Sequence, residues 1–254
     1  MDPLAQVNPK AELGEGVTVG PFSIIEEDVI IGPGTRVASH VLIARGARIG
    51  ASCQIHHGAV LSTIPQDMKF AGEETTLEIG DRTIVREYAT LNRGTKDRWK
   101  TIIGHDCLIM AYVHVAHDCI IGNHVILANA VNMAGHVIIE DYANIGGLVP
   151  IHQFVRVGTH AFVGGGYRIA KDVPPYVLAS GEPLKYAGLN VVGLKRRGFS
   201  SETLAILKKA YKFIYRSNLN VSQALEKIKS ELEITREIQN IIKFIENSQR
   251  GIIR

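Results

Sequence analysis

Histidine dominates the residues of this sequence that could do chemistry. There are 10 histidines in 254 residues, and four of them lie in the stretches His114-Val-Ala-His117-Asp118, Gly135-His136 and His152-Gln153. Imidazole accepts a proton near neutral pH and also binds transition metals. A group of histidines therefore indicates either a general base or a metal site, and the fold decides which of them meet.

The element that must position these residues is a repeat with a period of six. Aliphatic residues recur without a break from Ile103 to Ile169, and the residue two positions earlier is usually small or β-branched. Neither a helix of period 3.6 nor a simple strand of period two keeps such a stripe on one face. The pattern predicts a parallel β-helix, a coil of short strands with the aliphatic side chains stacked inside.

The repeat also predicts which residues stack. If six residues make one side of a triangular coil, residues eighteen apart lie above one another at about the strand spacing of 4.8 Å. His117, Gly135 and Gln153 then form one column, and Asp118 lies beneath His136. We expect five residues to gather around one edge of the coil: His114, His117, His136, His152 and Gln153.

Three roles remain open for this group from the residues alone. Three imidazoles at an edge could hold a zinc-like ion, as in the hexapeptide-repeat carbonic anhydrases. Alternatively, an imidazole acts as general base, with Asp118 to orient it, backbone N–H groups to hold an oxyanion, and Gly135 to allow close approach. The third role is structural, with backbone carbonyls as partners, and we expect it for the other histidines: His40, His56, His57, His105, His124 and His160.

The repeat sets the predicted domains. An earlier ladder begins at Val7, so we expect a β-helix over residues 1–176, with loops near 62–76 and 94–100 where the pattern lapses. Asp172-Val-Pro-Pro-Tyr ends the repeat, because consecutive prolines cannot donate ladder hydrogen bonds. Residues 177–254 are expected to form a connector followed by a C-terminal helical domain. Ser200 is the expected N-cap of its first helix, and this domain would cover the open end of the coil.

Composition narrows the function classes. The net charge is only +3, but from Lys195 onward there are 13 Lys and Arg against 6 Asp and Glu, which favours an acidic partner such as a nucleotide phosphate or an acidic carrier protein. The sequence has neither a run long enough to span a membrane nor the pattern of a signal peptide, so we expect a cytoplasmic protein. Cys53, Cys107 and Cys119 occupy small inward positions and are expected to be buried thiols.

Several stretches resemble the UDP-N-acetylglucosamine O-acyltransferases that begin lipid A biosynthesis. They are Ile64-Pro-Gln-Asp-Met-Lys-Phe-Ala-Gly-Glu, Val113-His-Val-Ala-His-Asp-Cys, Ala134-Gly-His, Val149-Pro-Ile-His-Gln-Phe, Asp172-Val-Pro-Pro-Tyr and Gly193-Leu-Lys-Arg-Arg-Gly-Phe-Ser. The resemblance covers essentially the whole chain. It implies a mainly β fold, a left-handed parallel β-helix with a C-terminal α-helical cap, assembled as a homotrimer.

The resemblance also implies an activity, the transfer of an (R)-3-hydroxyacyl group from acyl carrier protein to the sugar 3-hydroxyl. No cofactor and no metal are expected, since the carrier-protein thioester is itself a substrate. The expected partners are the carrier protein and a UDP-sugar, without nucleic acid or stable membrane insertion. A metal-dependent lyase and a non-catalytic scaffold remain as alternatives.

Residue roles follow by similarity. His117 matches the general base, Asp118 the carboxylate that orients it, and Gly135 the oxyanion N–H. Substrate-binding positions are matched by Gln66, Asp67, Lys69, His114, His136, His152, Gln153, Asn190, Arg196 and Arg197, the last three at a subunit interface. The acyl pocket is expected around Gly165, Tyr167 and Lys171.

Two positions depart from the family pattern. Asn92 stands where the family often has histidine, and Val192 stands where it often has glutamate. The departures leave a 3-amino variant of the sugar as an alternative acceptor, in which case the product would be an amide. The preferred acyl chain length is not predicted.

Overall fold

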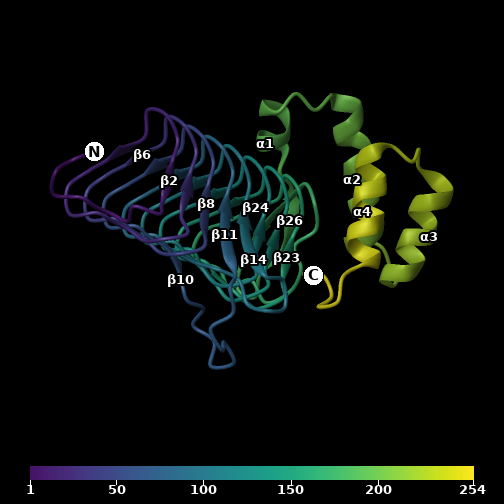
Figure 1. The fold of residues 1–254 in the computed structure, drawn as a ribbon. Helices are drawn as coiled ribbons and strands as arrows, with labels where there is room; N and C mark the ends of the chain where they lie inside the picture. The colour runs from purple at the N-terminus through teal and green to yellow at the C-terminus, as the bar shows by residue number, and fades with distance from the viewer.

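The chain winds into a three-sided coil in the computed structural model, which describes residues 1–254. Each turn of the coil contributes one short strand to each of three sheets, and strands of successive turns pair in parallel. The registers agree with the stacking of residues eighteen apart, since His114 pairs with Asn132 and Asn132 with Pro150. The predicted parallel β-helix is therefore present (Figure 1).

The strands divide among the sheets as follows. The first sheet holds β1 (Gln6–Val7), β4 (Ile24–Ile25), β7 (Leu42–Ile43), β10 (Val60–Thr63), β13 (Thr90–Asn92), β16 (His114–Val115), β19 (Asn132–Met133) and β22 (Pro150–Ile151). The second holds β2 (Glu12–Leu13), β5 (Ile30–Ile31), β8 (Ala47–Ile49), β11 (Thr76–Ile79), β14 (Lys100–Ile103), β17 (Ile120–Ile121), β20 (Ile138–Ile139) and β23 (Arg156–Val157). The third holds β3 (Thr18–Val19), β6 (Arg36–Val37), β9 (Gln54–Ile55), β12 (Ile84–Val85), β15 (Leu108–Ile109), β18 (Ile126–Leu127), β21 (Asn144–Ile145), β24 (Phe162–Val163), β25 (Val177–Ser180) and β26 (Lys185–Leu189).

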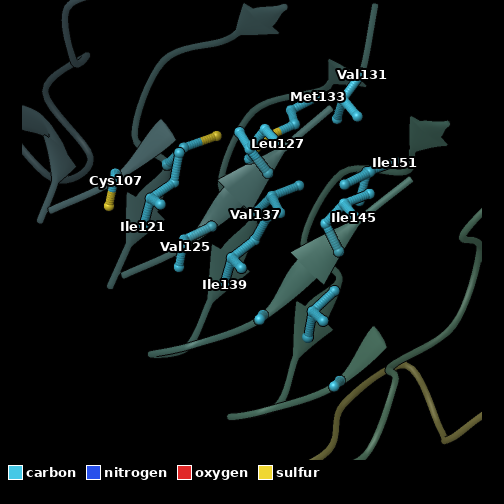
Figure 2. Packing of buried hydrophobic residues seen from close by; sticks show 14 of the residues in the cluster. Cys107, Ile121, Val125, Leu127, Val131, Met133, Val137, Ile139, Ile145 and Ile151 are labelled. Atoms are coloured by element: carbon cyan, nitrogen blue, oxygen red, sulfur yellow. The ribbon is translucent and has the colours of Figure 1, made fainter. Parts of the chain in front are cut away.

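The core is the aliphatic ladder itself. Ile121, Leu127, Met133, Ile139 and Ile145 are almost completely buried, and they stack on the corresponding residues of neighbouring coils (Figure 2). The second residue of most two-residue strands points inward, and the small or β-branched residue two positions earlier, such as Val125, Val131 or Val137, is buried as well. Two residues in six therefore fill each side. The three cysteines are buried and free, as predicted.

The corners of the coil adopt an unusual backbone conformation. The second residue of most turns has positive φ although it is not glycine, as at Asp118 (φ 59) and His136 (φ 62). A single residue in this region costs of order 1 kcal/mol or more, and stacking against identical turns above and below must offset that cost. We call the corner between the first and second sheets the first edge, with turns at 117–118, 135–136 and 153–154. The corner between the second and third sheets is the second edge, with turns at 105–106, 123–124 and 141–142.

Two segments interrupt the coil. Residues 64–75 join β10 to β11 without a strand of their own and protrude below the coil in Figure 1. The buried Asn92 amide holds the base of this loop, since its Nδ2 donates to Thr63 Oγ1 (2.9 Å) and to the carbonyl of Ile64 (3.1 Å). Residues 93–99 join β13 to β14 at the first edge.

The coil continues beyond the proline pair at which the sequence predicts its end. Pro175 lies in a corner turn, where it removes no ladder donor, and β25 then pairs in parallel with β24. The strand β26 folds back antiparallel to β25 and closes the third sheet. The expected connector over residues 177–199 therefore contains two strands of the coil.

Four helices follow at the end of the coil (Figure 1). They are α1 (Val191–Arg196), α2 (Ser201–Tyr215), α3 (Val221–Glu231) and α4 (Arg236–Glu246). Ser200 caps α2 as predicted, because its side chain accepts from the Thr203 N–H. The cap is joined to the last turn through two buried tyrosines: Tyr211 donates its hydroxyl to the Pro175 carbonyl, and Tyr176 accepts from Asn240 Nδ2 at 3.0 Å. No helix combines the length and the apolar character needed to cross a membrane.

Residues 251–253 return from the helices to the coil. Asp172 donates its N–H to the Gly251 carbonyl (3.0 Å), and Ile253 donates to the Asp172 carbonyl (2.9 Å). Asp172 and Ile252 thereby form a parallel bridge beside the last turn, and Ile252 and Ile253 are buried.

Candidate active site

His117 and Asp118 occupy one turn of the first edge, between β16 and β17. His117 Nδ1 lies 2.8 Å from Asp118 Oδ2, a hydrogen bond between neighbouring side chains. His117 is 8% exposed and Asp118 is completely buried. Since Nδ1 is committed to the carboxylate and no group of the chain bonds Nε2, the imidazole presents Nε2 as its free nitrogen.

Asp118 is an ionised carboxylate despite its burial. Burial raises the pKa of this carboxyl, but hydrogen bonds from the His117 ring and from the Thr95 hydroxyl and N–H outweigh it and lower the pKa to about 2. A buried carboxylate beside an imidazole fixes the ring orientation and favours its protonated form. This is the arrangement of a histidine that takes up a proton during a reaction.

Gly135 lies directly above His117 on the next coil. A Cβ at Gly135 would come within 2.6 Å of His117 Cε1 and 2.8 Å of Nε2, so only glycine leaves room for the ring. The Gly135 carbonyl accepts from Phe154, whereas its N–H meets no acceptor within the chain. A free backbone N–H beside a free imidazole nitrogen can stabilise an oxyanion as that nitrogen removes a proton.

A cavity of about 740 Å³ opens in front of these groups on the face of the first sheet. Seven of the residues that the sequence analysis singled out line it: Gln66, Asp67, Lys69, His114, His117, Gly135 and Gln153. Thr90 and Asn132, which the sequence analysis did not single out, line it as well. The cavity combines the loop of residues 64–75 with four successive coils, and most of its lining is polar.

Two further histidines near His117 are kept neutral. His114 shares a hydrogen bond with Thr90 Oγ1 (2.7 Å), and burial, together with His117, lowers its pKa. His136 is 7% exposed and packs edge-on against His117; burial lowers its pKa although Asp118 opposes the shift. Neutral neighbours do not repel a positive charge that forms on His117.

Other predicted substrate residues lie outside the cavity. His136 sits behind His117 and does not line it. His152 is exposed, and its Nδ1 contacts the Gln153 carbonyl at 3.2 Å. Gly165, Tyr167 and Lys171 lie on later coils and none of them lines it: Gly165 packs against Gly147, Tyr167 lies over Gly164, and Lys171 is exposed.

Asn190, Arg196 and Arg197 line a different pocket, of about 500 Å³, on the face of the third sheet. Asn190 caps α1 and donates Nδ2 to the His160 carbonyl (3.0 Å), while the Arg197 guanidinium lies 4.7 Å from the Tyr142 ring centre. Burial and the Arg197 charge lower the pKa of His160 to about 4, so the pocket holds its positive charge on the arginines. Val192 also lines this pocket. One chain therefore carries the two halves of the predicted site on different faces.

The residues of the first edge could also be considered as metal ligands. His117, Asp118 and His136 each place one ligand atom within 4.8 Å of the others. However, Asp118 Oδ2 already accepts from both His117 and Thr95, and the 2.8 Å bond to His117 requires a proton where an ion would sit. We therefore interpret the group as a hydrogen-bonded base.

A second cavity, of about 750 Å³, is as large as the one beside His117, so volume alone does not identify the active site. It lies on the second sheet and is lined mainly by aliphatic side chains and glycine backbone, including Ile102, Ile120 and Gly104. It lacks the pairing of a free imidazole nitrogen with a free N–H that distinguishes the first edge.

Comparison with known proteins decides the family. Residues 172–253 match the family model described as UDP-N-acetylglucosamine O-acyltransferase, domain 2, and residues 10–45 and 100–135 match the bacterial transferase hexapeptide model. The acyl-[acyl-carrier-protein]–UDP-N-acetylglucosamine O-acyltransferase of Chlorobaculum tepidum is 60% identical over 241 residues, 94% of this chain and 91% of that protein. The chain belongs to the UDP-N-acetylglucosamine O-acyltransferase family.

Solved structures of this family share the fold throughout. The UDP-N-acetylglucosamine acyltransferase of Bacteroides fragilis superposes with a TM-score of 0.99 at 48% identity, covering 100% of both chains. The enzyme of Arabidopsis is more distant, with a TM-score of 0.86 at 33% identity over 99% of both chains. The family resemblance and the left-handed β-helix with a helical cap, both expected from the sequence, are confirmed.

Thr95 is a residue of this site that sequence reasoning missed. It donates to both oxygens of Asp118 and is almost completely buried. The sequence marks residues 94–100 only as a lapse in the repeat. A signal was nevertheless present, because the lapse falls at the first edge, one coil before His117, where a polar side chain would meet the Asp118 turn.

Proposed function

We propose that this protein transfers an (R)-3-hydroxyacyl group from acyl carrier protein to the 3-hydroxyl of UDP-N-acetylglucosamine, the first step of lipid A biosynthesis. One arrangement at the first edge supports the proposal most directly: the free Nε2 of His117 faces a polar cavity beside the free N–H of Gly135. Relatives that bear this activity in their names match almost the whole chain. That similarity favours the acyltransferase over a metal-dependent lyase or a scaffold.

The reaction needs one proton to move twice. His117 Nε2 removes the proton of the sugar 3-hydroxyl while that oxygen attacks the thioester carbonyl carbon and forms the new C–O bond. The carbonyl oxygen becomes an oxyanion, and the Gly135 N–H donates to it. When the C–S bond breaks, the thiolate of the carrier protein takes the proton back from His117, and no cofactor is consumed.

Asp118 supports both proton movements. Its carboxylate holds Nδ1 of His117 at 2.8 Å, so that the ring keeps Nε2 toward the cavity. The negative charge also stabilises the imidazolium that exists between the two transfers. Asp118 remains ionised throughout, because its pKa of about 2 lies far below neutral pH.

The sugar nucleotide binds in front of the base in this proposal. Gln66, Asp67 and Lys69 reach the cavity from the loop of residues 64–75, and His114 and Gln153 reach it from the coil. Their amide, carboxylate, ammonium and imidazole groups suit the hydroxyl and amide groups of an N-acetyl sugar. We propose that the acyl chain binds around Gly165, Tyr167 and Lys171.

Completion of the site requires a second subunit. The arginine pocket lies on the third sheet and the His117 cavity on the first, so one chain cannot use both on one nucleotide. In a closed threefold ring, the third-sheet face of one prism can oppose the first-sheet face of the next, and Arg196 and Arg197 then reach the diphosphate. We therefore propose a homotrimer in the cytoplasm. Sedimentation should give a trimer, and a monomer at micromolar concentration would contradict it.

The carrier protein docks on the basic C-terminal region in this proposal. An acidic carrier is attracted to the excess of Lys and Arg from Lys195 onward, and added salt screens this attraction. The Michaelis constant for the acyl carrier protein should therefore rise between low and moderate ionic strength. A constant that does not change would remove this surface as the docking site.

A 3-amino UDP-sugar is the second candidate acceptor. Asn92 is buried at the base of the loop of residues 64–75 with its Oδ1 unpaired, and Val192 brings an apolar side chain to the arginine pocket. Both residues depart from the family pattern beside substrate-binding elements. The proton transfers are the same for an amine, and the product would be an amide.

One experiment tests acceptor and chain length together. The purified protein is incubated with UDP-N-acetylglucosamine or its 3-amino analogue and with hydroxyacyl carrier proteins of several chain lengths, and products are identified by mass spectrometry. We expect an ester of UDP-N-acetylglucosamine. An amide formed faster than the ester would select the second candidate, and absence of both products would overturn the proposed function.

A further inference from the structure

The segment joining β13 to β14, residues 93–99, lies against the Asp118 turn at the first edge. Within it, Thr95 is buried, with 6% of its surface exposed. The family comparison and the repeat pattern give this segment no role. Its hydrogen bonds to the site, however, are all made to Asp118.

Asp118 is held at all of its polar groups by residues 95–101. Thr95 donates its N–H to Asp118 Oδ1 (3.0 Å) and its hydroxyl to Oδ2 (2.7 Å). Arg98 Nη1 donates to the Asp118 carbonyl (2.9 Å), and the Asp118 N–H donates to Thr101 Oγ1 (2.9 Å). Only Thr95 binds both carboxylate oxygens.

This two-point contact fixes the plane of the carboxylate. The terminal torsion of an aspartate is soft, so a carboxylate held at one oxygen can rotate. An alternative partner lies nearby, since His136 Nε2 is 3.7 Å from Asp118 Oδ2. With Thr95 on both oxygens, the carboxylate stays directed at Nδ1 of His117.

Buried threonines elsewhere in the coil are used differently. The Thr83 hydroxyl donates to the Gly104 carbonyl (2.8 Å) and accepts from the Cys107 N–H (3.2 Å), so it joins backbone to backbone at the second edge. Thr35 makes the same pair of contacts with Gly50 and Cys53. Thr95 instead directs its hydroxyl and its N–H to a side chain that contacts the base.

We propose that Thr95 is a positioning residue for catalysis, which holds the Asp118 carboxylate so that His117 keeps Nε2 toward the substrate. The proposal rests on the proposed function, in which His117 is the base. Thr95 touches no substrate in this role and acts only through Asp118. The same hydrogen bonds help to keep the pKa of Asp118 low.

The test compares three single variants. Thr95→Val keeps the shape and removes the hydroxyl, Thr95→Ser keeps the hydroxyl, and Thr83→Val removes an equally buried hydroxyl at the second edge. We expect Thr95→Val to lower kcat about tenfold, with KM within about twofold, because a misoriented base affects the transition state more than binding. Thr95→Ser and Thr83→Val should keep kcat within about twofold, the latter with a lower Tm.

The pH profile separates positioning from mere stability. Without the Thr95 hydroxyl, the Asp118 carboxylate can turn away from His117 Nδ1, so it stabilises a positive charge on the ring less. The acidic limb of kcat/KM should therefore move to lower pH in Thr95→Val and stay in place in Thr83→Val. An unshifted limb in Thr95→Val would overturn the proposal.

A double-mutant cycle shows whether Thr95 acts through Asp118. In the Asp118→Ala background, Thr95→Val should change kcat by less than about twofold, because its target is gone. The same tenfold loss in both backgrounds would overturn the positioning role. Near-normal turnover of His117→Ala would instead remove His117 as the base, and absence of acyl transfer by the wild type would overturn the proposed function, so these failures are distinguishable from failure of the Thr95 proposal.

Discussion

The first and second edges have the same backbone geometry and opposite uses. At the second edge, three successive turns are capped by a side chain of the next coil: Asp81 donates its N–H to His105 Nδ1 (2.9 Å), His105 to Asn123 Oδ1 (2.9 Å), and Asn123 to Asp141 Oδ1 (2.7 Å). At the first edge, the Gly135 N–H has no such partner. A turn N–H is structural where the next coil supplies an acceptor and available to a ligand where it does not.

Two histidines make the comparison sharper. His105 and His117 both stand at the first position of a corner turn. His105 uses Nδ1 to accept a backbone N–H, whereas His117 gives Nδ1 to Asp118 and leaves Nε2 free beside glycine. The difference between these two histidines comes from the next residue in the chain and from the residue above in the stack, and not from their place in the repeat.

The largest expected effect is the loss of the base. His117→Ala should lower kcat by about 10² to 10⁴, the usual contribution of a positioned imidazole, while nucleotide binding and Tm are retained. His105→Ala is the matched control and should keep kcat within about twofold. Near-normal turnover of His117→Ala with an unchanged Tm would move the search for a base to His114 or His136.

A methyl group added at each edge should have opposite consequences. Gly135→Ala places its Cβ against the His117 ring, which must move, so we expect kcat to fall by about 10- to 10³-fold with little change in Tm. Gly104→Ala at the second edge would meet the backbone carbonyl carbon of Gly122 at 2.6 Å, so it should lose about 1–3 kcal/mol of stability and keep its specific activity. Thermal melts and initial rates of both variants measure these effects. If Gly104→Ala lost as much activity as Gly135→Ala, the predicted difference between the edges would be wrong.

Asp118 should influence both rate and acid stability. Asp118→Asn should lower kcat less than His117→Ala does, because the imidazole remains. The folded pKa of about 2 lies below the ordinary value of 3.8, so the charged carboxylate stabilises the fold above pH 4, and this contribution is lost as the pH falls toward 2. Denaturant midpoints at pH 5 and pH 3 should therefore differ less in Asp118→Asn than in the wild type. An equal difference would mean that Asp118 is not stabilised by its partners.

The smallest expected effect is the loss of one cap at the second edge. Asn123→Ala leaves the His105 N–H to water, so we expect about 0.5–1.5 kcal/mol of destabilisation and unchanged kcat. Urea unfolding together with an activity assay measures both. A loss of activity greater than about threefold would show that the second edge also serves the reaction.

The parts of the molecule that obey the repeat could be predicted from the sequence. A strict period of six fixes both the inward face and the register, which is why the column of His117, Gly135 and Gln153 and the cavity-lining His114 follow from counting alone. The same regularity places the buried cysteines. Side-chain directions at the corners do not follow from the period, so His152 was expected at the site and instead points to solvent.

The parts that interrupt the repeat could not be predicted in detail. The contact of Thr95 with Asp118 depends on the path of residues 93–99, for which the ladder gives no register. Pro174 and Pro175 were expected to end the coil, but prolines are tolerated in a corner turn, where the missing N–H costs no ladder bond. The separation of the arginine pocket from the His117 cavity required the positions of α1 and of the third sheet.

The return of residues 251–253 to Asp172 has a consequence for how the protein is made. The ribosome releases the coils in order, and each can pack on the one before as it emerges. The strand edge beside Asp172 nevertheless stays unpaired until residues 251–253 are translated, after all four helices. A message cut short in its last codons would thus yield a nearly finished coil with an uncovered edge, a template for pairing between nascent chains.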